Sequence, residues 1–221
     1  MTQAPVVFLV DVDNTLLDND RFESDLKRHI EREFGAASRD RYWTILDMLL
    51  LDLGYRDYLG ALQRYRIEHP YDVRLISMSS YLVDYPFANR LFPGALDVLE
   101  RLRAWGPTVI LSDGDVVFQP RKVERSGISE AVDGQVLIYI HKEEALDHVE
   151  QRYPAQHYVL VDDKPRILSA IKETWRERVT TIFPRQGHYA LDAKAYRPAD
   201  LTVDRIADLL SRDLPALLPM P

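Results

Sequence analysis

Two acidic side chains, with one residue between them, follow an apolar run near the N-terminus. Asp11 and Asp13 come directly after the stretch VVFLV at residues 6–10. Carboxylates at this spacing can hold a hard divalent cation and leave one oxygen free to attack an electrophile. An ordinary polar turn after a strand has the same pattern, so the spacing alone does not indicate a catalytic site. The residues at the ends of the other apolar runs decide between the two interpretations.

Ser112 and Lys142 each follow a later apolar run. A short hydroxyl in a loop with a glycine, as in Ser112-Asp113-Gly114, suits the binding of phosphate oxygens, although a turn serine would look the same. The ammonium of Lys142 suits the neutralisation of a phosphate and a nucleophile. A solvated lysine at the start of a helix is the alternative, but the positive end of the helix dipole disfavours it.

Asp162 and Asp163 are adjacent acids that follow a fourth apolar run, residues 158–161. Two carboxylates at the end of a buried strand are costly unless a cation or hydrogen bonds compensate them. A helix N-cap explains one of them, but it does not easily explain both. The pair therefore points to a cation site.

Five apolar runs rich in β-branched residues predict buried strands at 6–10, 108–111, 136–140, 158–161 and 179–183. Amphipathic segments between them predict helices at about 94–105, 142–152 and 164–176. This alternation predicts an α/β fold with a parallel sheet and helices on both faces. Ligands bind beyond the carboxyl ends of such strands, which is where these acids, the serine and the lysine are found.

The segment after the first strand does not alternate, because about 65 residues of helical pattern precede the second strand. One helix carries Phe22 and ends at Gly35, and a second runs from Ser38, as N-cap, to Gly54. A third covers about 55–68, and a fourth buries Val73, Ile76 and Leu82. We predict a helical domain at 18–87, inserted into a core formed by 1–17 and 88–221.

The composition excludes several classes of protein. The 221 residues carry a net charge of −7, which argues against nucleic acid or anionic membranes as partners. The absence of cysteine excludes disulfides, thiolate zinc sites and cysteine nucleophiles. The apolar stretch 6–10 is too short to span a bilayer, and the first ten residues lack the basic start of a signal peptide, so we expect a soluble, cytoplasmic protein.

The order DxDxT, Ser, Lys, Asp-Asp at successive strand ends resembles the haloacid dehalogenase (HAD) superfamily, in which magnesium-dependent phosphohydrolases predominate. The resemblance covers about 1–17 and 88–190 and includes four motifs in order. It implies a three-layer, Rossmann-like parallel-sheet core. The helical insertion resembles the first type of cap domain in that superfamily.

The resemblance also implies roles for the acids. Asp11 would be the nucleophile that forms an aspartyl-phosphate, and Asp13 would protonate the leaving group and then activate water. Mg²⁺ would be bound by Asp11, the backbone carbonyl of Asp13 and Asp163. Asp162 would support the metal site through water or Lys142, and which of Asp162 and Asp163 binds directly stays open.

Ser112 and Lys142 would hold the transferring phosphoryl group. Glu143 follows Lys142 where the superfamily often has proline, so Lys122, in the helix after the second motif, is the alternative source of the cation. Further substrate contacts are predicted for Asn14, Thr15, Asp113, Gly114 and Arg185. The acids Asp113 and Asp115 would favour substrates with a hydroxyl or an amine near the phosphate.

The predicted function is hydrolysis of a small phosphorylated metabolite. A phosphomutase with the same aspartyl-phosphate is the alternative, and a non-catalytic, phospho-accepting signalling module is a weaker one. Halide leaves without a proton, and dehalogenases in the superfamily accordingly lack an acid at the position of Asp13. The presence of Asp13 therefore disfavours dehalogenation. The physiological substrate and the oligomeric state cannot be read from the sequence.

Overall fold

A six-stranded parallel sheet forms the centre of the fold in the computed structural model, which describes residues 3–191 and 196–213. The strand order is β3-β2-β1-β4-β5-β6. The strands are β1 (Ala4–Val10), β2 (Thr108–Asp113), β3 (Val136–Tyr139), β4 (Ala155–Val161), β5 (Val179–Pro184) and β6 (Leu201–Val203). Val10 lies opposite Ile110 of β2 and Val161 of β4, so these three strands end side by side.

Alternate residues of each strand enter two separate apolar clusters, one on each face of the sheet. Phe8 and Val10 face α5 (Ala95–Arg103), α6 (Phe118–Arg125), α7 (Ile128–Ala131) and the short 3₁₀ helix η6 (Ile206–Ser211). Val7 and Leu9 face α8 (Leu146–Arg152) and α9 (Pro165–Trp175). Period-two alternation between two buried faces explains the continuous apolar runs, and the predicted three-layer α/β fold is confirmed.

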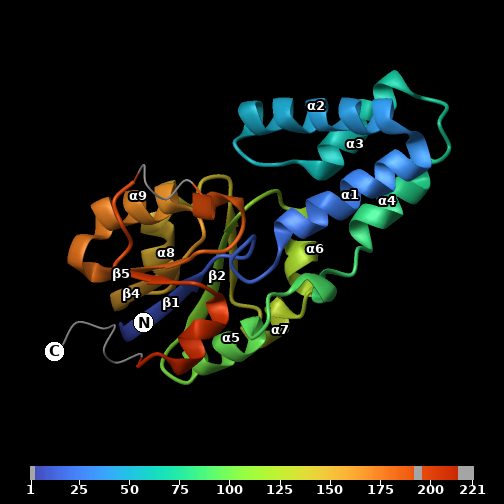
Figure 1. Ribbon diagram of the computed structural model, residues 1–221. Helices are drawn as coiled ribbons and strands as arrows, with labels where there is room; N and C mark the ends of the chain where they lie inside the picture. The colour runs from blue at the N-terminus through green and yellow to red at the C-terminus, as the bar shows by residue number, and fades with distance from the viewer. Residues whose placement is uncertain (1–2, 192–195, 214–221) are drawn as a thin grey trace.

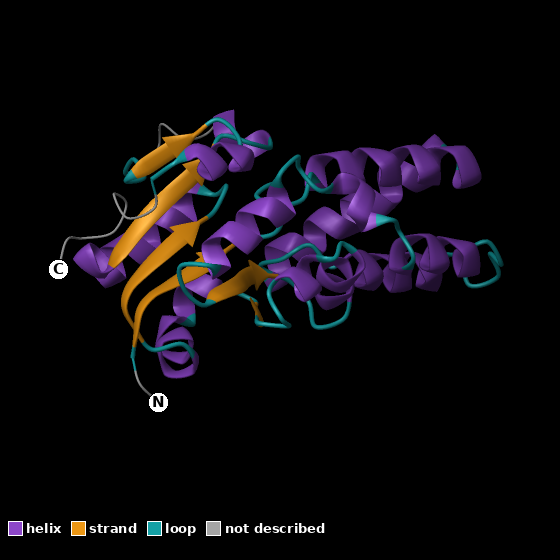
Figure 2. Ribbon diagram, turned by 90° about the horizontal axis from the view of Figure 1, so that it is seen from below, coloured by secondary structure: helices purple, strands orange, loops and turns teal. Residues whose placement is uncertain are grey.

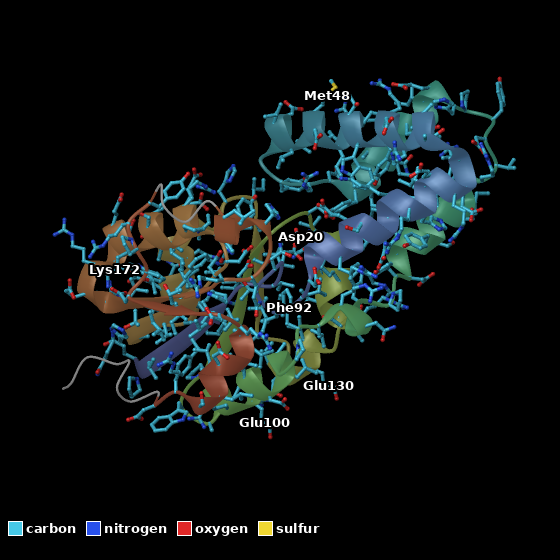
Figure 3. All side chains as sticks on the ribbon, viewed as in Figure 1. Asp20, Met48, Phe92, Glu100, Glu130 and Lys172 are labelled. Carbon is cyan, nitrogen blue, oxygen red and sulfur yellow. The ribbon has the colours of Figure 1, made fainter. Side chains whose placement is uncertain are left out.

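Four helices lie between β1 and α5 and extend away from the sheet (Figures 1 and 2). They are α1 (Asn19–Phe34), α2 (Ala36–Leu53), α3 (Tyr58–Glu68) and α4 (Leu75–Val83), and we call them the helical insertion. Phe22, Leu26 and Ile30 of α1 are buried in the same cluster as one face of the sheet. Met48 lies on the outer side of α2 and is 62% exposed (Figure 3).

The insertion meets the core at two chain segments that run side by side. Leu17 pairs with Leu91 in an isolated antiparallel bridge, and the Asp18 N–H donates to the Arg90 carbonyl. The short 3₁₀ helix η1 (Phe87–Arg90) lies directly before Leu91, where the chain passes from the insertion back to the core. Two chain segments that are hydrogen-bonded to each other thus join the insertion to the core.

Three details of the predicted elements are wrong. Gly35, at φ +90°, both ends α1 and begins α2, so Ser38 is not an N-cap and its hydroxyl donates to the Phe34 carbonyl instead. Val73 lies before α4 and is exposed, and Ile76 is exposed because α4 buries the face that carries Met78 and Leu82. The sixth strand, β6, was not predicted, since it has only three residues.

Within the described residues, no helix is long and apolar enough to cross a membrane.

Candidate active site

The turn after β1 places the first two acids. The N–H groups of Thr15, Leu16 and Leu17 all point to the Val12 carbonyl, and Asn14 lies at φ +57°. Asparagine tolerates this left-handed conformation better than most other residues with a side chain. The turn therefore reverses the chain tightly enough to present residues 11 and 13 at the end of the sheet.

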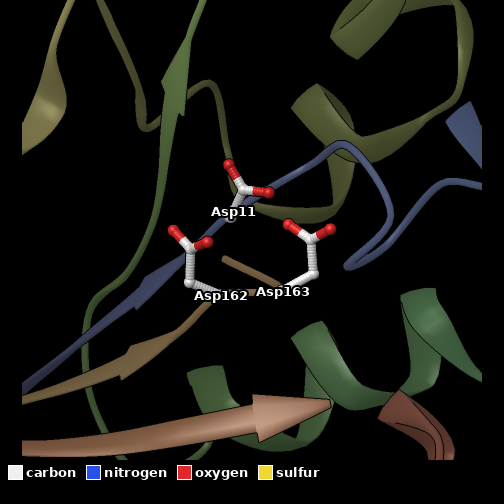
Figure 4. A group of neighbouring side chains, drawn as sticks. All are labelled: Asp11, Asp162 and Asp163. Atoms are coloured by element: carbon white, nitrogen blue, oxygen red, sulfur yellow. The ribbon is translucent and has the colours of Figure 1, made fainter. Parts of the chain in front are cut away.

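Three buried carboxylates converge there. Oxygens of Asp11, Asp162 and Asp163 lie within 4.8 Å of one another, and each residue is at most 1% exposed (Figure 4). Neither carboxylate oxygen of Asp163 has a hydrogen-bond partner among the described residues. Burial and the neighbouring charges of Asp11 and Asp162 raise the pKa of Asp163 well above its usual value. A hard cation with oxygen ligands fits this donor set.

Lys142 supplies the one buried positive charge that contacts this cluster within the described chain. Its Nζ lies 2.5 Å from Asp11 Oδ1 and 2.6 Å from Asp162 Oδ2. Burial alone would lower the pKa of Lys142, but the two carboxylates raise it well above its usual value, so the side chain is charged. Burial and Asp162 nevertheless raise the pKa of Asp11 to about 7, despite the opposing effect of Lys142.

Thr15 and Ser112 are buried, and neither lines the cavity to which Asp163 contributes. The Thr15 hydroxyl donates to Asp11 Oδ2 over 3.2 Å and accepts the Asp163 N–H over 3.0 Å, so it links two of the acids. Its predicted contact with substrate is therefore corrected to a supporting one. Ser112 is 1% exposed, and its hydroxyl accepts from Gln119 Nε2.

Asp13 does not join the three-acid cluster through its side chain. Its carboxylate pairs with Lys122 Nζ, at 2.7 and 2.9 Å, and lines the cavity. The structure thus separates the two lysines that the sequence left as alternatives. Lys142 lies at Asp11, whereas Lys122 lies at Asp13.

A cavity of about 460 Å³ lies between the end of the sheet and the helical insertion. The core contributes Asp13, Asn14, Asp163 and the loops after β2, β4 and β5. Asn14 accepts the N–H groups of Asn19 and Asp20, so it also fixes the start of α1. Asp20 lies at this junction between the insertion and the core (Figure 3).

Asp113, Gly114 and Asp115 line the cavity, but both acids are already engaged. Asp113 accepts the Lys142 N–H over 2.8 Å and lies 3.5 Å from Lys164 Nζ. Asp115 accepts two N–H groups at the start of α6. The repulsion of anionic substrates that the sequence suggested is therefore partly compensated.

Arg185 is a predicted substrate contact that the structure holds away from the cavity. Its guanidinium pairs with Asp204 on the exposed surface, and it is absent from the cavity wall. Its predicted role in substrate binding is corrected accordingly. Residues further along the same loop, His188 and Tyr189, line the cavity instead.

Among the polar side chains that the insertion contributes to the cavity wall, three that were not predicted from the sequence contact one another. Glu23 accepts the Tyr58 hydroxyl over 2.7 Å and lies 3.2 Å from Arg56 Nε, and all three line the cavity. Helical periodicity finds the buried face of a helix but not which polar residues face another part of the chain. Lys164 and Arg166, also in the wall, closely follow the Asp-Asp pair and could have been found from that position.

The chain matches a family model described as haloacid dehalogenase-like hydrolase over residues 6–174. A search of curated proteins finds no match. The crystal structure of a haloacid dehalogenase-like hydrolase from Burkholderia xenovorans LB400 is similar at 62% identity and a TM-score of 0.90. That alignment covers 95% of this chain and 99% of that chain.

Two more distant structures share the fold. The HAD-hydrolase YfnB of Bacillus subtilis, bound to magnesium, has 15% identity and a TM-score of 0.63, with 95% of this chain and 98% of that chain covered. The L-2-haloacid dehalogenase of Xanthobacter autotrophicus, with chloropropionic acid covalently bound, has 17% identity and a TM-score of 0.60, with 92% and 96% covered.

Proposed function

The chain belongs to the haloacid dehalogenase-like hydrolases, and from that premise we propose that it is a Mg²⁺-dependent phosphomonoester hydrolase acting on a small phosphorylated metabolite. The reaction would pass through an aspartyl-phosphate on Asp11. Residues 18–87 would act as a cap over a core of 1–17 and 88–221, because cavity-lining side chains come from both parts.

The observation that carries the proposal is the buried carboxylate of Asp163, with both oxygens unpartnered in the described structure, beside Asp11 and Asp162. A buried, unpaired carboxylate costs several kcal/mol, and a divalent cation would compensate it. Asp11 and Asp163 would hold Mg²⁺ with the backbone carbonyl of Asp13. The magnesium bound to the distant B. subtilis hydrolase is consistent with this assignment.

The side chains suit in-line phosphoryl transfer in two steps. An oxygen of Asp11 attacks phosphorus, the bond from phosphorus to the ester oxygen breaks, and that oxygen takes a proton from Asp13. Water then attacks the phosphoenzyme, Asp13 accepts a proton from it, and phosphate leaves with Asp11 restored. Lys142 offsets the repulsion between Asp11 and the substrate, and bound Mg²⁺ would supply a second positive charge for the same purpose.

Asp13 favours an ester over a haloacid as substrate. An alkoxide leaving group needs a proton, whereas halide leaves as a stable anion, so only the ester reaction uses a proton donor in its first step. The dehalogenase similarity is at 17% identity and shows a shared fold. It does not select the chemistry of this site.

The test is hydrolysis of p-nitrophenyl phosphate and of an alkyl phosphate by the purified protein, once with Mg²⁺ and once with EDTA. Halide release from 2-chloropropionate is measured in parallel. We expect phosphate release that EDTA abolishes and Mg²⁺ restores, with less activity in Ca²⁺ because its looser coordination misaligns the attack. Halide release, or full phosphatase activity in EDTA, would refute the proposal.

A further inference from the structure

Lys122 is a charged side chain that is 1% exposed at the junction between core and insertion. Its ammonium has three hydrogen-bond partners: Asp13 Oδ1 at 2.7 Å, Asp13 Oδ2 at 2.9 Å and Asn19 Oδ1 at 3.0 Å. A lysine ammonium has three N–H donors, so the group is fully satisfied. Of these partners, Asp13 alone carries a charge.

The rest of its surroundings is aromatic. The Nζ lies 5.8 Å from the ring centre of Phe22, 5.9 Å from that of Phe87 and 5.7 Å from that of Phe118. These rings come from α1, η1 and α6, so they enclose the ammonium from both the insertion and the core. Aromatic faces attract a cation but do not replace water, so the charge depends on the carboxylate of Asp13.

Gln119 reaches the same carboxylate from the same face of α6. Its Nε2 donates to Asp13 Oδ2 over 3.3 Å and to Ser112 Oγ over 3.0 Å. Residues three apart on a helix lie next to each other, so α6 presents Gln119 and Lys122 together. Both oxygens of Asp13 are thus held from one side, while the carboxylate lines the cavity on the other.

We propose that Lys122 is a positioning residue, which aims the carboxylate of Asp13 into the cavity so that it accepts the proton of the water that attacks the phosphoenzyme. This inference rests on the function proposed above. A carboxylate held through both oxygens by an ammonium suits proton acceptance at one defined place, because its orientation is fixed. Lys122 should therefore matter more to hydrolysis of the phosphoenzyme than to its formation.

The experiment is stopped-flow hydrolysis of p-nitrophenyl phosphate with Mg²⁺ by wild-type protein, Lys122→Met and Lys122→Gln. Nitrophenolate leaves with little need of a proton, so formation of the phosphoenzyme should stay fast. For Lys122→Met we expect a burst of one nitrophenolate for each active site, then steady turnover slowed about ten- to a hundredfold. Lys122→Gln keeps an amide group with two N–H donors and should show the same burst with a smaller loss.

A second measurement separates positioning from a structural role. In an Asp13→Asn background, Lys122→Met should slow turnover no further, because its effect passes through Asp13. Arg121→Met, on the same helix with its guanidinium paired to Asp84 rather than to Asp13, is the matched control and should show neither burst nor slow phase.

Each outcome bears on the inference. Wild-type turnover in Lys122→Met, a uniform loss without a burst, or additive losses in the double variant would overturn it. Failure of both Lys122 variants to fold, seen by circular dichroism, would also overturn it in favour of a purely structural lysine. A wild-type protein that hydrolyses no phosphate ester would instead refute the proposed function itself.

Discussion

Asp163→Asn should make the metal-free protein more stable while it removes the response to magnesium. The carboxylate of Asp163 is buried, has no partner for either oxygen among the described residues and lies beside Asp11 and Asp162. Its pKa is raised by burial and by these neighbours, so the folded protein holds this proton more tightly than the unfolded chain. Stability is therefore lost as the pH rises above the unfolded pKa of about 4.

The magnitude follows from the cost of burying a charged group without a partner. A neutral amide avoids most of that cost, so removal of the charge should stabilise the metal-free protein by about 1–2 kcal/mol at neutral pH. For a chain of this size we expect Tm to rise by about 3–6 °C. Mg²⁺ at a hundred times its dissociation constant should raise the wild-type Tm by about 5–10 °C, from a stabilisation of about 2.7 kcal/mol.

The assay is thermal unfolding at neutral pH in EDTA and in Mg²⁺, with Asp13→Asn as the matched variant. That substitution leaves the ammonium of Lys122 buried without a counter-charge, so it should destabilise the protein by about 3 kcal/mol. The two Asp→Asn changes should thus have opposite signs. A lower Tm for metal-free Asp163→Asn, or an undiminished Mg²⁺ response in it, would refute this account of the acid cluster.

Three further predictions concern proton transfer, recognition and pH. Asp13→Asn should slow turnover by about a hundred- to ten-thousandfold for an alkyl phosphate and less for p-nitrophenyl phosphate, as steady-state rates on both esters would show. Arg56 belongs to the part of the cavity wall that the insertion contributes. Arg56→Ala should change KM and the ranking of a panel of phosphorylated metabolites more than it changes the pH dependence of kcat. An unchanged ranking would refute substrate recognition by the insertion. Hydrogen bonds from Lys172 and Thr181 outweigh the effect of burial and lower the pKa of Asp200, so its stabilisation is lost as the pH falls. The Tm difference between wild type and Asp200→Asn should narrow between about pH 6 and pH 3, and a constant difference would contradict this.

The sheet could be predicted because its strands are buried on both faces and therefore read as continuous apolar runs. The runs at 6–10 and 158–161 lie within β1 and β4, which are neighbours in the sheet. β6 could not be predicted in this way, because three residues at a sheet edge leave too short a pattern. Gly35 shows a limit of capping rules, since one glycine ends one helix and begins the next without a serine cap.

The site could be predicted where its residues follow parallel strands that end side by side. Parallel strands that end together bring Asp11, Asp162 and Asp163 into one cluster, and their order along the chain was sufficient to expect this. The partners of isolated side chains were not predictable. Asp204 holds Arg185 away from the cavity, and Lys122 pairs with an acid more than a hundred residues before it.

The insertion was predicted as helical, but its contribution to the cavity was not. Glu23 and Arg56 form their ion pair between α1 and the loop before α3, a contact that depends on how helices pack. Polar residues on an amphipathic helix all look solvated in the sequence, so those that face the cavity cannot be separated from those that face water.

Direct detection of a covalent phosphoenzyme on Asp11 tests the central claim most closely. The protein would be mixed with p-nitrophenyl phosphate and Mg²⁺, quenched in acid within milliseconds, digested and examined by mass spectrometry. The account predicts one added phosphoryl group on the peptide that contains Asp11, with none in EDTA and none in Asp11→Asn. Turnover with no phosphorylated peptide, or a phosphoryl group on Asp13 instead, would contradict it.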